Sequence, residues 1–383
     1  MEKFSAYRDP GTGIQPFLTP VPPLGSQLLA KVTLPLRYAI ATIRTALFGV
    51  LVAAYLLLVN GVCLVLLPIP PLHQLVQHAI TFVLGRTALF LVGFVWIAPE
   101  QFNRKRSRGP RLPEKWNTKA GDVIISNWAS WIEVLWLAIR FNPVFVLPVT
   151  NTIPESPNGT RGSTPVSYTP GRRTGTGSAN VQMSSRSTSP RVPIAGFQQV
   201  SLLTMITRTG NVPVYGASAI PVLSLEEIRR NASGPVVVFP ECTTSNGRGL
   251  LRFADVFHQD VPVKKYQVFV MSVRYDPPTD LAPTLTLPIP LGILNPLPHI
   301  FTLMTSLSFA QVTIRLLAPS ESPGSQLFVA SDVLSDYTGD DMLTEASAAL
   351  IAHMGKLKRT SLGWEDKSNF LEFYRGKSQR RDL

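Results

Sequence analysis

The N-terminal part of the chain has almost no charge of either sign. No Asp or Glu occurs between residues 10 and 98, and residues 45–85 contain no Asp, Glu, Lys or Arg. The segment Thr45–Ile69 is a run of 25 uncharged residues, whereas a helix needs about 20 apolar residues to cross a bilayer. A second apolar run, Ala79–Ala98, is interrupted only by Arg86. We therefore expect a membrane-embedded element, with buried core helices of a soluble protein as the alternative.

The position of these runs and the charges around them define the expected topology. The first run begins too far into the chain, and is too long, to be a cleaved signal peptide. Basic residues precede the first run and follow the second, namely Lys31, Arg37, Arg44 and the segment 104–111. Positive charge at both ends places both ends on the cytoplasmic side. Two spanning helices and a hairpin dipping into one leaflet, with its bend near Pro68–Pro71, both satisfy this pattern.

Cysteine and histidine are also scarce. The two cysteines, Cys63 and Cys242, cannot form a disulfide framework, which fits a reducing compartment. The chain has five histidines and no cluster of Cys and His with metal-ligand spacing, so we expect no metal site.

Basic residues outnumber acidic ones, and the formal net charge is +12. A basic chain favours anionic partners such as phosphate-bearing ligands or an anionic membrane surface. The sequence has no signature of a known nucleic-acid-binding module, so we expect no nucleic-acid partner.

The pattern changes at Gly121 to short apolar runs that alternate with helical periodicity. This alternation predicts an α/β fold, with a mixed central sheet covered by helices. Expected strands are residues 122–126, 144–149, 211–215, 235–240, 267–275 and 311–317, and expected helices are residues 130–141, 194–207, 222–230, 250–257 and 341–359.

One segment does not fit that sheet. Residues 151–192 are rich in Ser, Thr, Gly and Pro, and such a composition predicts a disordered insertion. The expected organisation is a flexible N-terminus (1–33), membrane helices or hairpin (34–100), a globular domain (112–320) that contains the insertion, and a C-terminal helix with a basic tail (321–383).

Two sequence blocks carry a resemblance to a known family. "FPECTTS", Phe239–Ser245, resembles the Phe-Pro-Glu-Gly-Thr-Arg-Ser block of the glycerolipid (lysophosphatidic acid) acyltransferase family. "SNWASWIEVLWL", Ser126–Leu137, resembles that family's Asn-His-x-x-x-x-Asp block. Asn127 is kept, Trp128 stands at the histidine position and Glu133 at the aspartate position.

The resemblance extends over about residues 121–317, apart from the insertion. Pro193–Tyr215 and Val268–Tyr275 stand where the family has its second block and a late strand. "FPECTTSNGRGLL" is particularly similar to fungal lysophosphatidic acid acyltransferase-like proteins of the endoplasmic reticulum and lipid droplets. The resemblance implies a membrane protein there, with its globular domain facing the cytoplasm.

The resemblance also implies a reaction. In that family, a histidine oriented by an aspartate takes the proton from a glycerol hydroxyl, whose oxygen attacks the thioester of acyl-CoA. The implied partners are membrane lipids, a lysophospholipid acceptor and acyl-CoA as co-substrate, with no bound cofactor. The implied site residues are Glu133 and Trp128 in the catalytic position and Asn127, Glu241, Cys242, Thr243, Thr244, Ser245 and Arg248 for substrate binding.

This sequence departs from the family at decisive positions. Trp128 cannot abstract a proton, because its indole N–H is a donor only. Glu133 becomes a possible base if burial raises its pKa toward neutrality. Cys242 replaces the family's glycine and Thr244 its arginine, so Arg248 or Arg252 is expected to contact phosphate. Tyr215 also stands where an arginine is usual.

Each of these residues also has a structural interpretation. Glu241, Thr243 and Ser245 can serve as turn and cap residues, Glu133 can pair with a basic residue, and Trp128 can pack at the mouth of an apolar groove.

Two further chemistries stay open. Cys242 is a candidate thiolate nucleophile, and His258 is a candidate substitute base.

The missing histidine also permits a different class of function. A catalytically degenerate lipid-binding or recruitment protein of lipid droplets or endoplasmic reticulum is the main alternative. A membrane-shaping hairpin whose globular domain recognises other proteins is a third.

Overall fold

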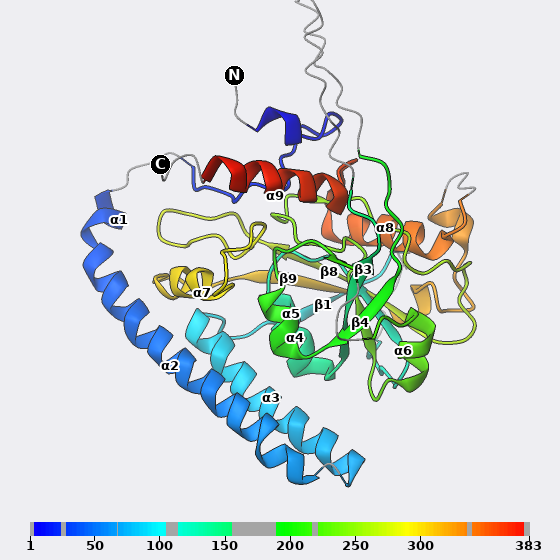
Figure 1. Cartoon of the computed structure of the whole chain (residues 1–383), viewed down its shortest axis with the longest axis horizontal. Coiled ribbons are helices and arrows are strands. Elements are labelled where there is room, and N and C mark those ends of the chain that lie inside the picture. Colours follow the sequence, from blue (N-terminus) through cyan, green and yellow to red (C-terminus); the bar gives the residue numbers. More distant parts are fainter. Residues whose placement is uncertain are drawn as a thin grey trace, which may run out of the picture.

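The computed structural model describes residues 4–23, 28–66, 68–104, 114–154, 189–216, 221–334 and 339–378 of the 383-residue chain. The short helix α1 (Leu28–Val32) precedes two long helices, α2 (Leu34–Asn60) and α3 (Pro70–Val92). A 3-10 helix, η2 (Val62–Leu66), lies between them. The long helices lie side by side along one flank of the molecule (Figure 1).

Both long helices have the length and composition to cross a membrane. In the most apolar windows of Leu34–Val59 and Pro70–Val92, only 6% and 28% of the residues are buried inside the protein. The outward surface therefore presents apolar side chains, such as Ile43, Val50 and Phe82. The two apolar helices predicted from the sequence are confirmed.

The pair of helices is attached to the globular domain along its length. The Arg37 guanidinium donates to the carbonyl of Thr305 at 3.0 Å, and Arg44 donates to the carbonyl of Ser306 at 3.0 Å. On α3, Gly85 lies so close to the domain that a Cβ atom there would be 2.9 Å from Ile139 Cγ1. Glycine thus permits α3 to pack closely on the domain.

The globular domain is built on a mixed eight-stranded sheet with the order β1-β9-β8-β2-β6-β3-β4, in which β5 pairs with β3. Pairs β3/β4 and β8/β9 are antiparallel, and the others are parallel. The strands are β1 (Pro99–Phe102), β2 (Val123–Ser126), β3 (Val144–Thr150), β4 (Gly196–Val200), β5 (Val214–Tyr215), β6 (Val236–Val238), β8 (Val268–Tyr275) and β9 (Val312–Leu317). A separate parallel pair joins β7 (Gly249–Leu250) to β10 (Lys358–Arg359). The predicted fold class is confirmed.

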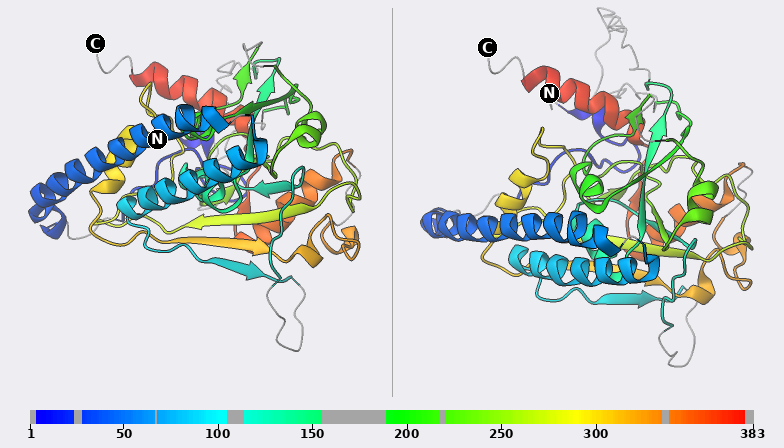
Figure 2. Two further views of the ribbon diagram at one scale, coloured as in Figure 1. Left: turned by 90° about the horizontal axis from the view of Figure 1, so that it is seen from below. Right: turned by 60° about the horizontal axis from the view of Figure 1, so that its bottom comes forward.

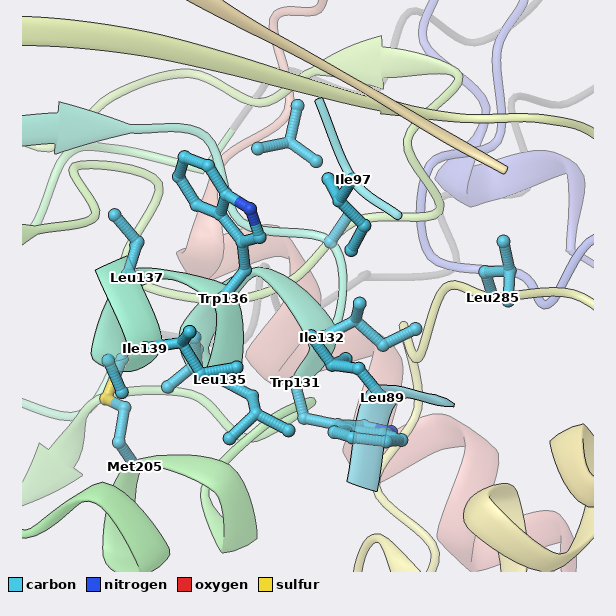
Figure 3. Close-up of a cluster of buried hydrophobic side chains, with 14 of the residues drawn as sticks. Leu89, Ile97, Trp131, Ile132, Leu135, Trp136, Leu137, Ile139, Met205 and Leu285 are labelled. Carbon is cyan, nitrogen blue, oxygen red and sulfur yellow. The ribbon is translucent and has the colours of Figure 1, made fainter. Parts of the chain in front are cut away.

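Helices cover both faces of the sheet because its central strands are apolar on both faces. On β2, Ile124 belongs to a buried cluster that includes residues of α3, α4 and α7, whereas Val123 and Ile125 belong to a second cluster that includes residues of α6 and α8. The covering helices are α4 (Ile132–Phe141), α5 (Leu202–Thr207), α6 (Leu225–Asn231), α7 (Leu297–Met304), α8 (Met342–Gly355) and α9 (Trp364–Ser378). Figure 2 shows α2 and α3 running side by side across the molecule. Figure 3 shows α4 side chains close to Leu89 of α3 and Met205 of α5.

Several expected elements differ in the structure. The helix predicted over residues 194–207 is instead strand β4 followed by the short helix α5. The helix predicted over 250–257 is wrong, because its backbone bonds to distant segments: Arg252 N donates to Leu362 O and Ala254 N to Pro240 O. The strand predicted over 211–215 is reduced to β5.

The two ends of the chain pack against each other. The N-terminus, expected to be flexible, packs on α9 from Phe4 to Leu18. The helix predicted over 341–359 is α8, and the last helix, α9, was not predicted. Residues 155–188, which form most of the predicted insertion, lie outside the described residues.

Candidate functional site

The two sequence blocks meet at one edge of the sheet. Strands β2, β6 and β8 are parallel neighbours, so their carboxyl ends lie at the same edge. Residues 127–130 follow β2, residues 239–248 follow β6, and Tyr275 ends β8. Ligand sites in open α/β sheets typically occur at this edge.

Glu241 ties the two blocks to each other. Its carboxylate is 1% exposed; Oε1 accepts a hydrogen bond from the Trp128 amide at 2.7 Å, and Oε2 accepts one from the Leu251 amide at 2.9 Å. Burial raises the pKa of Glu241 to about 8, although the two amide donors act in the opposite direction. The nearby Glu133 charge adds to this rise in the pKa of Glu241.

Glu133 binds the same loop from the first turn of α4. Its Oε1 accepts from the amides of Ala129 at 2.5 Å and Ser130 at 2.6 Å, and its Oε2 accepts from the Tyr275 hydroxyl. Burial raises the pKa of Glu133 to about 7, against the opposing effect of these donors. A carboxyl group with this pKa changes its protonation near neutral pH, as the sequence interpretation required of a base.

Trp128 packs inside the protein and has no basic atom. Its indole ring stacks on Phe239 with 5.1 Å between ring centroids, and its Nε1 donates to the Ser130 carbonyl at 3.0 Å. With Cys242 it lines a cavity of about 10 Å³, which has room for one water molecule at most.

The remaining polar residues of the blocks bind the backbone. Asn127 exchanges two hydrogen bonds with Val273, at 2.9 and 2.8 Å. The buried hydroxyls of Thr243, Thr244 and Ser245 donate to the carbonyls of Asn211 (2.7 Å), Leu287 (2.6 Å) and Gly249 (3.5 Å). These contacts are the turn duties considered for Thr243 and Ser245 from the sequence, and a substrate-binding role for this group stays a prediction.

Cys242 occupies a backbone position that suits glycine. Its φ is +56°, a left-handed conformation that costs side-chain-bearing residues energy, and the resembled family has glycine there. The thiol is buried and donates weakly to the Pro240 carbonyl at 3.5 Å. Burial raises the pKa of the thiol well above its ordinary value, which disfavours the thiolate that a nucleophile needs.

Both ends of the chain cover the 239–248 turn, which the sequence patterns did not show. The buried Lys367 of α9 donates to the carbonyl of Thr244 at 2.7 Å and to its hydroxyl at 3.3 Å. Burial lowers the pKa of Lys367, and the nearby Glu241 opposes that effect. From the N-terminal segment, the carbonyls of Gln15 and Leu18 accept from the Asn246 side chain at 2.7 and 2.9 Å.

Two cavities approach the carboxyl pair from different sides. An apolar cavity of about 310 Å³ lies between α2, α3, α4, α5 and α7, and Trp131 and Leu135 line it near Glu133. A polar cleft of about 220 Å³ is lined by Tyr275, by Asp276 and by three basic residues, Arg248, Arg274 and Lys356. Within the described residues, these three exposed cations form no side-chain hydrogen bond or ion pair. Neither Glu133 nor Glu241 lines either cavity.

His299 lies in the wall between these cavities. Its Nδ1 accepts from the Trp131 indole at 3.1 Å, and its Nε2 lies 3.0 Å from the Thr284 carbonyl. Thr284 lines the basic cleft, as Trp131 lines the apolar cavity. Burial lowers the pKa of His299 to about 4. Because both ring nitrogens are engaged, His299 has no free lone pair with which to act as a base in this arrangement.

The other sequence candidates lie elsewhere. His258 is exposed on the loop that packs on the start of α8, and Tyr215 is 58% exposed. Arg252 pairs with Glu365 at 3.2 Å, so Arg248 is the block arginine that reaches the cleft. Among the described residues, no group of three His, Cys, Asp or Glu could hold a metal ion.

Comparison with known proteins adds one relative. No family model and no solved structure matches the chain. A protein of Schizosaccharomyces pombe named "Putative lysophosphatidic acid:oleoyl-CoA acyltransferase" is 22% identical over 377 residues, covering 97% of this chain and 98% of that protein. Over nearly its whole length, the chain is therefore similar to a protein named as an acyltransferase.

Proposed function

We propose that this protein transfers a fatty acyl chain from acyl-CoA to lysophosphatidic acid or a related lysophospholipid. The observation that carries the proposal is the position of the Glu133–Tyr275 pair. Trp131 and Leu135, beside Glu133 in sequence, line the apolar cavity, and Tyr275 itself lines the basic cleft. The full-length likeness to a protein named as an acyltransferase supports the same reaction.

The two cavities match the two ends of a lysophospholipid. The apolar cavity would hold an acyl chain, since its lining is almost entirely hydrocarbon. The basic cleft would hold the phosphate through Arg248, Arg274 and Lys356. In this arrangement Arg274 and Lys356 join Arg248 in the role that a motif arginine fills in the resembled family.

In the chemical step, Glu133 acts as the base, and the Tyr275 hydroxyl relays the proton to it. The acceptor hydroxyl gives its proton to the Tyr275 oxygen while the Tyr275 proton passes to ionised Glu133. The acceptor oxygen then attacks the thioester carbonyl, an ester bond forms, and the carbon–sulfur bond breaks. The proton then returns from Glu133 through Tyr275 to the departing thiolate, which becomes the thiol of CoA.

The apolar helices also support a proposal for the location. The apolar helices α2 and α3 would hold the domain at a membrane. We place that membrane at the endoplasmic reticulum or lipid droplet, with the globular domain on the cytoplasmic side.

One observation favours a second candidate function, a lipid-binding or recruitment protein without catalysis. Trp128 replaces the resembled family's base, and both Glu133 oxygens already accept hydrogen bonds, one from two loop amides and the other from the Tyr275 hydroxyl. Such a protein would keep the lipid cavities and lack turnover.

The deciding experiment is a transfer assay. Purified protein in liposomes receives labelled acyl-CoA and lysophosphatidic acid, with Glu133→Gln and Tyr275→Phe as variants. We expect product from the native protein and a loss of about 100-fold or more in rate in each variant. Unchanged rates in both variants would exclude the proposed pair, and no product across a panel of lysolipids would favour the non-catalytic function.

A further inference from the structure

A third cavity, of about 610 Å³, lies between the apolar helices and the opposite edge of the sheet. Val144 and Phe145, at the amino end of β3, line it, as does Val200 at the end of the antiparallel strand β4. Because β3 runs parallel to β6, this edge is opposite the one that carries Glu133 and Glu241. The mechanism proposed above does not use this cavity.

The polar lining of this cavity carries no charge. It has carboxamides from α3, β4 and the α4–β3 loop together with hydroxyl groups, and no Asp, Glu, Lys or Arg. The lining carboxamide residues are Gln74, Gln77, Asn142 and Gln199. Within the described residues, these four side chains make no hydrogen bond. A carboxamide both donates and accepts, so this lining suits hydroxyl and ester groups.

The polar cavity continues into the apolar cavity. Tyr55, Thr81, Leu202 and Leu203 line both of them. On α3, one helical stripe runs along both, with Gln74, Gln77 and Thr81 on the polar part and Leu84, Gly85 and Ala88 on the apolar part. This spacing of three and four residues places all six on one face of the helix.

The glutamines of α3 line the cavity, whereas the most exposed side chains of this helix include apolar ones. Leu75, Phe82 and Phe90, on other positions of α3, are 66%, 52% and 60% exposed. The helix thus directs carboxamides toward the domain and apolar side chains outward. A helix of a membrane-bound protein that places polar groups on its protein-facing side commonly marks a ligand path.

We infer that the joined cavities bind an uncharged glycerolipid, a mono- or diacylglycerol. Its glycerol hydroxyl and ester groups lie among the carboxamides, and an acyl chain lies in the apolar cavity. A phosphate is excluded from the polar part, because an anion buried without a cation is strongly disfavoured, and the cations lie in the cleft at the other edge. The uncharged lipid and a lysophospholipid therefore compete for the apolar cavity, and this last consequence rests on the proposed function.

The experiment measures binding without acyl-CoA, so its result does not depend on turnover. A monoacylglycerol with a brominated acyl chain is added to protein in detergent, and quenching of tryptophan fluorescence is followed. Trp131 lines the apolar cavity, whereas Trp96 is 75% exposed and responds to free lipid. All proteins therefore carry Trp96→Phe, and adding Trp131→Phe should remove the saturable signal.

The Gln74→Leu/Gln77→Leu variant tests the head-group cavity. We expect its affinity for the brominated monoacylglycerol to fall about tenfold, as for the loss of one or two hydrogen bonds, while its affinity for brominated lysophosphatidic acid changes less than about twofold. Equal changes for both lipids, or none for either, would overturn the inference, as would the absence of saturable quenching in the parent protein. Gln199→Leu, on a strand end, repeats the test if the double variant unfolds at a lower temperature.

Discussion

The backbone amide of Trp128 donates a 2.7 Å hydrogen bond to the carboxyl group of Glu241. This contact joins the residue at the resembled family's histidine position to the glutamate of the Phe239–Ser245 block. Glu241 also accepts a hydrogen bond from the Leu251 amide, and the nearby Lys367 charge acts to lower the pKa of Glu241. Glu241 therefore has a structural role, because it joins the loop after β2 to the segment after β6.

The substitution Glu241→Gln tests this structural role. Glutamine offers one acceptor oxygen where two amides now donate, so a buried N–H loses its partner. We expect the free energy of unfolding to fall by about 1–3 kcal/mol, measured by urea denaturation. Glu372→Gln, at an exposed position of the same chain, is the control and should leave the midpoint unchanged. Equal midpoints for both variants would contradict the role of Glu241.

The raised pKa values predict how stability depends on pH. Burial raises the pKa of Glu133 to about 7 and that of Glu241 to about 8, from 4.5. The folded protein therefore holds protons that the unfolded chain has released, and stability is lost as pH rises from about 4.5 through about 7 and 8. Glu133→Gln stays neutral, so its stability should fall less steeply between about pH 5 and 7.

This pH prediction is measured as a slope, because Glu133→Gln also changes the amide contacts and so the absolute stability. Urea midpoints are compared across the pH range for the native protein and the variant. Identical slopes would show that Glu133 does not titrate in that window. If Glu133 is the base, the transfer rate should instead rise with pH through about 7, opposite in sign to stability.

Asn246 predicts the behaviour of the N-terminal segment. Its side-chain nitrogen donates to the carbonyls of Gln15 and Leu18, and its amide donates to Pro16 O at 2.8 Å. Asn246→Asp would place a carboxylate oxygen against two carbonyl oxygens. We expect the segment to detach, so that limited proteolysis cleaves the chain before residue 23 at least about tenfold faster. This factor corresponds to a loss of about 1.4 kcal/mol in the free energy that holds the segment on the domain. Cleavage at the native rate would show that other contacts hold the segment.

The sequence predicted the parts of the fold that local pattern controls. Strands β2, β3 and β8 are short, buried apolar runs, and parallel strands buried on both faces have that pattern. The resemblance to the family implied that the two blocks form one site, and the structure brings them together after β2 and β6. Glu133 was singled out because it stands at the family's aspartate position, five residues after Trp128, and the sequence made it a possible base on the condition that burial raises its pKa.

The parts that the sequence did not predict depend on long-range contacts. Strand β1 is largely polar and exposed, and it forms by pairing with β9. The Tyr7 hydroxyl donates to Asn369 O at 3.1 Å, a contact between the two ends of the chain that no local pattern records. Lys367 lies on the apolar stripe of α9, between the buried Trp364 and Leu371, where a charged side chain is not expected, and its ammonium reaches Thr244. Such positions are fixed by hydrogen-bond partners far away in the sequence.

The basic cleft provides the sharpest test of substrate orientation. Arg274 lies at the end of β8, one residue before Tyr275, and lines the cleft with Arg248 and Lys356. If the cleft binds the acceptor phosphate, Arg274→Gln removes one charge-assisted contact and should raise KM for lysophosphatidic acid about tenfold or more. The rate at saturating acceptor should change little, because Glu133 and Tyr275 stay in place. The control is Arg140→Gln, an exposed arginine at the end of α4 away from the cleft. A fall in the saturated rate at unchanged KM would instead place Arg274 in support of Tyr275, and equal kinetics in both variants would move the phosphate out of this cleft.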